Sequence, residues 1–220
     1  MNKKIAFTLA EVLITLGIIG IVAALTIPQL IAKHKKVVVS TALKKFSTSL
    51  QNSTIRANYD NGEVGLTAKN RDFYNKDNPE QAAQMLEKYY KPYMAITSIE
   101  EGTKGAFAYF QDGSAMYFRR FREDDTTTTW SGTYVYFCPN GKDCRTLDES
   151  NENLANLIGK KLFVFYNSGN VTWALKKYTR DELLEKCKNP GVTPEHSEFC
   201  TALIIGDNWE IKSDYPRRFW

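Results

Sequence analysis

Four cysteines are the residues of this chain best suited to form covalent bonds: Cys138, Cys144, Cys187 and Cys200. They allow three disulfide pairings, of which Cys138–Cys144 and Cys187–Cys200 join the nearest neighbours in sequence. The first pair would clip a turn-rich loop, and closing the longer second loop would add about 3 kcal/mol in the chain-entropy estimate. A zinc site built from all four thiolates is one alternative, although no two cysteines are separated by just two residues. Reduced, free thiols are the other alternative.

The usual signatures of catalysis are missing from the sequence. It contains no Gly-rich phosphate loop, no HExxH and no GxSxG pattern. Its two histidines, His34 and His196, have no obvious catalytic partner, which argues against most histidine-based sites. We therefore expect a protein without enzymatic activity, cofactor or bound metal.

Two charged clusters offer weaker ligand sites. Four carboxylates gather in one loop, and their spacing matches no standard calcium loop, which favours a solvated surface; they are Asp143, Asp148, Glu149 and Glu152. Near the C-terminus, Arg217 and Arg218 form a short basic segment that could touch nucleic acid. Packing of Trp220 on the rest of the chain is the simpler interpretation of this segment, so nucleic acid is the least favoured partner.

An uncharged apolar run lies near the N-terminus. Val12–Ala32 is 21 residues without a charge, and a helix of that length, at about 1.5 Å per residue, crosses the ~30 Å core of a bilayer. A buried core helix is disfavoured, because a helix that is apolar all round finds little protein here to hide in. A cleaved secretory signal ending at Ala24 is the stronger alternative. However, the apolar run continues past Ala24, and a signal has no use for Glu11.

The residues before and inside this run resemble a known family. The segment KKIAFTLAEVLI, residues 3–14, is similar to the leader and mature start of type IV pilin-like proteins, which include type IV pilins and type II secretion pseudopilins. The shared pattern is a basic leader, a small residue at the cut, an aromatic first residue, Glu as fifth mature residue and an apolar helix. The family usually has Gly where this chain has Ala6. Pro28 falls where such pilins often carry a proline, and it favours a kink.

The resemblance implies a processing and assembly route. A prepilin peptidase would cleave between Ala6 and Phe7 on the cytoplasmic side, Phe7 would be N-methylated, and Glu11 would act in assembly. Cleavage removes two lysines and so lowers the formal charge from +4 to +2. The positive-inside rule alone would place the lysine-rich segment after Ala32 in the cytoplasm. The family and the cysteines, which suit an oxidising compartment, instead favour a head outside the cytoplasm.

The sequence after Ala32 changes from wholly apolar to striped. One helical face carries five apolar residues, namely Val39, Leu43, Phe46, Leu50 and Ala57. We predict a single helix from about residue 7 to about 58, with its first half in membrane or filament core and its second half packed on a head. A second helix is predicted from Asn78-Pro79 to about residue 90. The capping box of Thr179 and Glu182 predicts a third, short helix.

Aromatic and β-branched runs between turn residues predict an antiparallel sheet. The runs 105–110 and 114–122 flank Asp112-Gly113, and 130–138 follows. Further hairpins are predicted for 161–166 with 170–175 and for 201–205 with 209–212. Few crossover helices separate these strands, so we predict an α+β fold with the long helix packed on an antiparallel head. The expected organisation is a leader (1–6), a transmembrane or filament-core helix (7–32) and a head (33–220).

We therefore expect a structural subunit of an extracellular type IV pilus-like filament. The resemblance implies the partners: a prepilin peptidase, other pilin subunits in a homo- or hetero-filament, the pilus or secretion machinery, and the membrane before assembly. It also implies a bacterial inner-membrane precursor that becomes a cell-surface or periplasmic filament, and a Cys187–Cys200 bond that fastens the C-terminal region. The alternative is a secreted binding protein or enzyme whose first 24 or so residues are only a signal peptide.

Overall fold

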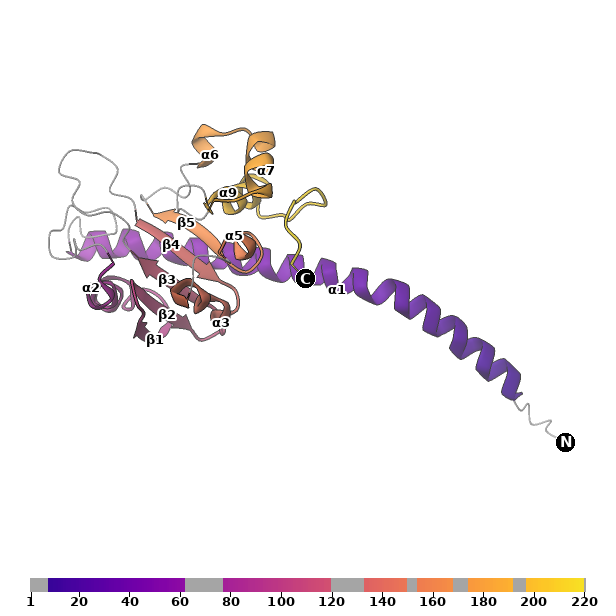
Figure 1. The fold of residues 1–220 in the computed structure, drawn as a ribbon. Helices are drawn as coiled ribbons and strands as arrows, with labels where there is room; N and C mark the ends of the chain where they lie inside the picture. Colours follow the sequence, from indigo (N-terminus) through magenta and orange to yellow (C-terminus); the bar gives the residue numbers. More distant parts are fainter. Residues whose placement is uncertain are drawn as a thin grey trace.

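The computed structural model describes residues 8–61, 77–119, 133–149, 154–167, 174–191 and 197–219. Its longest element is helix α1, Leu9–Asn61. The C-terminal half of α1 lies along a compact head, while the N-terminal half extends beyond it as a gently curved rod (Figure 1). The predicted single helix is confirmed, and Pro28 lies inside it without interrupting the helical run.

One face of α1 holds the head in place. The predicted stripe is buried at Leu43, Phe46, Leu50 and Ala57, and Val39 packs at its edge. Aromatic rings fix the contact: the centroid of the Phe46 ring lies 4.1 Å from that of Phe137 in a stacked arrangement and 5.2 Å from that of Phe165. These contacts anchor the helix on the sheet.

The sheet has five antiparallel strands in the order β1-β2-β3-β4-β5. The strands are β1 Ile96–Glu101, β2 Ala106–Phe110, β3 Ala115–Arg119, β4 Thr133–Cys138 and β5 Phe163–Asn167. The predicted hairpin around Asp112-Gly113 is β2–β3, where Gly113 adopts φ of +83° and the Phe110 N–H donates to the Ser114 carbonyl. The α+β fold class is confirmed.

The C-terminal part of the chain corrects two strand predictions. The predicted strand 201–205 lies instead in helix α9, Phe199–Gly206, and the structure assigns no strand to 209–212. The strand predicted at 170–175 as the partner of β5 is also wrong at its C-terminal end, because Ala174 begins the short helix α6, Ala174–Lys177. Residues 170–173 lie outside the described part. Six of the eight residues of α9 are buried, and a short, mostly buried apolar run has no periodicity that separates a helix from a strand.

The other predicted helices are present. Helix α2, Pro79–Met85, continues as the π-helix η2, Leu86–Tyr90, and the Asn78 side chain caps it by accepting from the Gln81 N–H. Helix α7, Arg180–Lys188, begins at the predicted capping box. Three short helices between β4 and β5 were not predicted: α3 Gly141–Cys144, α4 Thr146–Glu149 and α5 Leu154–Leu157.

Candidate functional site at the start of the long helix

A capping box closes the start of α1. The Thr8 N–H and hydroxyl donate to Glu11 Oε2 at 2.8 and 2.9 Å, and the Glu11 N–H donates to Thr8 Oγ1 at 3.2 Å. This reciprocal pair satisfies backbone donors that a helix start leaves without partners. A threonine and a glutamate three residues apart before an apolar run are the sequence signature of such a box, although the resemblance implied only an assembly role for Glu11.

The predicted processing residues stand next to this box in the chain. Ala6 and Phe7 lie outside the described residues, so pairing between Glu11 and a Phe7 amine stays a prediction. The carboxylate nevertheless lies at the N-terminal end of the rod, close in sequence to that amine. Both hydrogen bonds from Thr8 end on Oε2, and a carboxylate has about four acceptor positions. Glu11 can therefore cap its own helix and still accept from a second donor through Oε1.

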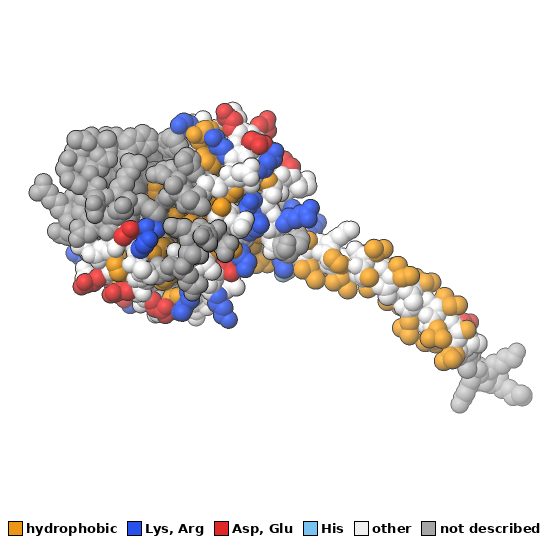
Figure 2. Space-filling model, viewed as in Figure 1, with side chains coloured by type: hydrophobic (Ala, Val, Ile, Leu, Met, Phe, Trp, Pro, Cys, Tyr) orange, Lys and Arg blue, Asp and Glu red, His pale blue; other side chains and the backbone are white. Residues whose placement is uncertain are grey.

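The rod that follows exposes apolar side chains along its whole length. Figure 2 shows hydrophobic side chains along it, and they are exposed from Leu9 to Ile31. Helix α1 is long and apolar enough to cross a membrane, and none of its most apolar stretch is buried against the head. A methyl group added at Gly17 or Gly20 would meet no atom within 4 Å. The surface of the rod is therefore available to lipid or to other helices.

The C-terminal segment meets α1 at the junction of rod and head. Lys36 Nζ donates to the Lys212 carbonyl at 3.1 Å. Lys212 Nζ in turn donates to Asp207 Oδ1 at 2.6 Å, and Arg180 binds the same carboxylate through two nitrogens at 2.7 and 2.9 Å. The hydrogen bonds from Arg180 are the largest cause that lowers the pKa of Asp207; burial opposes them, and Lys212 adds to them. Arg180 also binds Asp214, so one cluster ties α7 to the end of the chain.

Both disulfides lie in the head, in the pairing that the sequence analysis favoured. Cys138–Cys144 joins β4 to α3, and Cys187–Cys200 joins α7 to α9. All four sulfur-bearing side chains are buried. Disulfides of this kind are typical of proteins in oxidising compartments.

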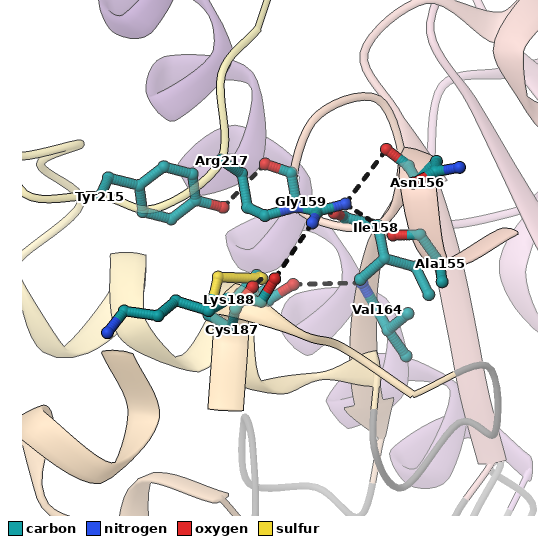
Figure 3. The surroundings of a disulfide bond; sticks show 11 residues. Ala155, Asn156, Ile158, Gly159, Val164, Cys187, Lys188, Tyr215 and Arg217 are labelled. Atoms are coloured by element: carbon teal, nitrogen blue, oxygen red, sulfur yellow. Dashed lines mark hydrogen bonds between the residues drawn. A yellow bond between two sulfur atoms is a disulfide. The ribbon is translucent and has the colours of Figure 1, made fainter. Parts of the chain in front are cut away.

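The last residues close over the second disulfide (Figure 3). The Arg217 guanidinium donates to four backbone carbonyls, those of Ala155, Asn156, Ile158 and Lys188. The Tyr215 hydroxyl donates to the Gly159 carbonyl at 2.8 Å, and burial raises the pKa of this tyrosine. Arg217 thus ties the C-terminal segment to the head, Arg218 is exposed, and Trp220 lies outside the described residues.

The structure describes only some of the other predicted ligand groups, and those do not come together. Asp143 is paired with Lys161, whose Nζ lies 3.0 Å from Oδ1; the side chains of Asp148 and Glu149 and all of residue 152 lie outside the described part. His34 is exposed on α1, and residue 196 is also outside that part. Among the described residues no group of three or more potential metal ligands comes together.

One groove of about 270 Å³ lies between α1 and the β2–β3 turn. Its walls include Phe46, Phe110 and the ion pair of Lys45 with Asp112, 2.8 Å apart. Burial acts to raise the pKa of Asp112, but hydrogen bonds from Lys45 and Ser114 together outweigh it and lower this pKa to about 2. The groove is lined by residues that already join helix and sheet, and sequence reasoning did not foresee it.

Two known families match different parts of the chain. Residues 1–27 match the "Prokaryotic N-terminal methylation motif", and residues 29–219 match a "Family of unknown function (DUF6613)". The first match covers the leader, the capping box and most of the rod; the second covers the rest of α1 and the whole head. No curated protein and no solved structure matches the chain.

Proposed function

This chain belongs to the DUF6613 family of unknown function and carries the N-terminal methylation motif of a type IV pilin-like precursor; from that premise we propose that it is a structural subunit of an extracellular pilus-like filament. The precursor lies in the bacterial inner membrane with its head outside the cytoplasm. A prepilin peptidase cleaves it between Ala6 and Phe7 and Phe7 is N-methylated. The mature chain then assembles with other pilin subunits through the rod of α1.

The observation that carries the proposal is the continuity of the exposed apolar rod with the helix that anchors the head. In a secreted protein cut after Ala24, the residues that follow would stay in water. Leu25 is 67% exposed and Leu30 is 68% exposed, and they would form part of an apolar patch that soluble monomers rarely carry. Insertion first in lipid and then among neighbouring helices gives these side chains an apolar environment in both states.

The work of the protein is assembly rather than catalysis. Pilin subunits exchange the bilayer for a filament core, and each head becomes part of the filament surface. The peptidase and the pilus or secretion machinery that drive this exchange are separate proteins. A motility or adhesion pilus, a secretion pseudopilus and a DNA-uptake filament all use this one mechanism.

The mature N-terminus tests the proposal directly. We would express the chain together with a prepilin peptidase and a filament system, and determine the N-terminal residue by mass spectrometry. N-methylated Phe7 is the expected result, whereas an unmodified Leu25 would establish the secreted alternative. Ala6→Gly is expected to be cleaved at least as fast as the natural chain, and the bulkier Ala6→Leu to remain uncleaved. Normal processing of Ala6→Leu would place the cut elsewhere.

A further inference from the structure

Three lysines come directly after the apolar rod in the sequence: Lys33, Lys35 and Lys36. We name them the basic collar. Successive helical residues are turned by about 100° and rise about 1.5 Å, so these three and His34 face four directions around α1 within about 5 Å along its axis. A ring of this kind meets the membrane surface whichever way the helix tilts.

Helix α1 has no acidic residue near the basic collar. Between Glu11 and Asp60 the sequence contains no acidic residue. On the side of the head, Lys36 donates to the carbonyl of Lys212, a neutral acceptor that leaves the ammonium charge uncancelled. Lys33 is exposed on the rod side of that contact. The charges of Lys33 and Lys36 therefore point to an anionic partner at the depth where the apolar rod ends.

We propose that the basic collar binds the anionic headgroups of phospholipids on the membrane face that carries the head. The inference rests on the proposed membrane-spanning precursor. Lysine ammonium groups reach out from the end of a span while their methylene stems stay against apolar surface. A basic residue next to an anionic membrane surface gains about fivefold in affinity. Such binding also compensates for a lysine distribution that opposes the proposed orientation under the positive-inside rule.

The test uses the full chain in lipid nanodiscs made of equal parts phosphatidylglycerol and phosphatidylcholine. Native mass spectrometry of the released protein reports which lipids remain bound. We expect phosphatidylglycerol to exceed phosphatidylcholine about fivefold or more among lipids bound to the natural chain. Lys33→Gln/Lys36→Gln should lower the ratio several-fold, and Lys33→Arg/Lys36→Arg should keep it high because the charges remain.

The matched control removes the same charge from the same helix farther from the rod. Lys44→Gln/Arg56→Gln alters two exposed residues on the part of α1 that lies along the head, and it should leave the lipid ratio unchanged. An equal loss in the control would overturn the collar, as would an unchanged ratio in Lys33→Gln/Lys36→Gln. Circular dichroism of each variant identifies any loss that comes from unfolding, and the Arg variant then decides whether charge retains the lipid.

Three further outcomes distinguish the possible reasons for failure. If inorganic phosphate removes the bound lipid at an ionic strength where sodium chloride does not, the collar is a general phosphate site and the assignment to lipid is wrong. If the natural chain is not retained in the nanodiscs, the membrane-spanning segment itself is refuted, and the collar with it. Retention of the chain in the nanodiscs without a preference for either bound lipid would refute the collar alone.

Discussion

At the scale of single residues, Glu11 has a contact in the precursor and a different proposed contact in the filament. In the structure its carboxylate accepts two hydrogen bonds from Thr8, both on Oε2. In the proposed filament it meets the amine of Phe7, from its own subunit or a neighbour. A charge placed alone in an apolar core is costly, and an ion pair offsets that cost. Because Oε1 has acceptor positions of its own, the cap and the ion pair can coexist.

Variants of the capping box separate the two contacts. Thr8→Val removes the hydroxyl that caps the helix but keeps the carboxylate, so we expect filaments to form. Glu11→Gln keeps a capping oxygen but loses the charge, and Glu11→Ala loses both. For these two we expect normal membrane insertion, with incorporation into filaments lost when no natural copy is present. Membrane level, N-terminal processing and filament yield are the measurements, and normal filaments from Glu11→Ala would contradict charge pairing.

At the scale of elements, regular periodicity and turn chemistry made α1, α2 and the strands β2 to β5 predictable. The stripe of α1 repeats every three or four residues over several turns, and the β2–β3 hairpin has a glycine at its positive φ. Strand β1 was missed because its sequence, ITSIEE, is polar and ends in two glutamates, which are depleted in strands. The resemblance singled out Glu11, whose role in assembly stays a prediction, whereas the cap that Glu11 forms with Thr8 was not predicted.

Helix α9 and the chain after it depend on contacts that no local pattern reveals. Arg180 binds Asp207 across 27 residues of sequence and Asp214 across 34. Arg217 binds the Ala155 carbonyl across 62 residues. A run such as TALII fits either a strand or a buried helix, and the disulfide and ion pairs of the folded head decide between them. Local sequence therefore could not predict the C-terminal region.

Asp207 gives these contacts a measurable pH dependence. Its side chain is only 5% exposed, so Asp207→Asn should lower the free energy of unfolding at pH 7 by about 1–3 kcal/mol. Because the folded-state pKa lies below the ordinary 3.8, the stability that the carboxylate supplies is present above about pH 4. That stability is lost as the pH falls through the lowered pKa.

The measurement is the thermal unfolding of both chains by circular dichroism from pH 7 to pH 2. The difference between the natural chain and Asp207→Asn should shrink below pH 4. Asp214→Asn is the matched control, since that side chain is 48% exposed and binds the same arginine. A smaller change is expected for it. Equal effects of the two substitutions at pH 7 would show that burial of Asp207 is not what matters.

At the scale of the whole molecule, the two disulfides stabilise the head by different amounts. Cys187–Cys200 closes a loop with a sequence separation of 13 and Cys138–Cys144 one of 6. In the chain-entropy estimate the first contributes about 3 kcal/mol and the second about 2. We expect Cys187→Ala/Cys200→Ala to lower the free energy of unfolding in urea more than Cys138→Ala/Cys144→Ala. Peptide mapping without reductant should find both bonds, and four free thiols in exported protein would contradict both the bonds and the proposed location of the head.

The rod and the head should also separate as physical units. The head buries the stripe of α1 on the sheet within one chain, through Leu43 and the Phe46–Phe137 stack, whereas the rod makes no such contact. A chain that begins at Lys33 should therefore be folded, soluble and mainly monomeric by circular dichroism and size-exclusion chromatography. Leu43→Ala in that chain should cost about 2–5 kcal/mol, because the side chain is fully buried. Val38→Ala, at a position 50% exposed, should cost little. A folded but aggregating truncated chain would mean that the stripe is an assembly surface between subunits rather than the internal contact of one head.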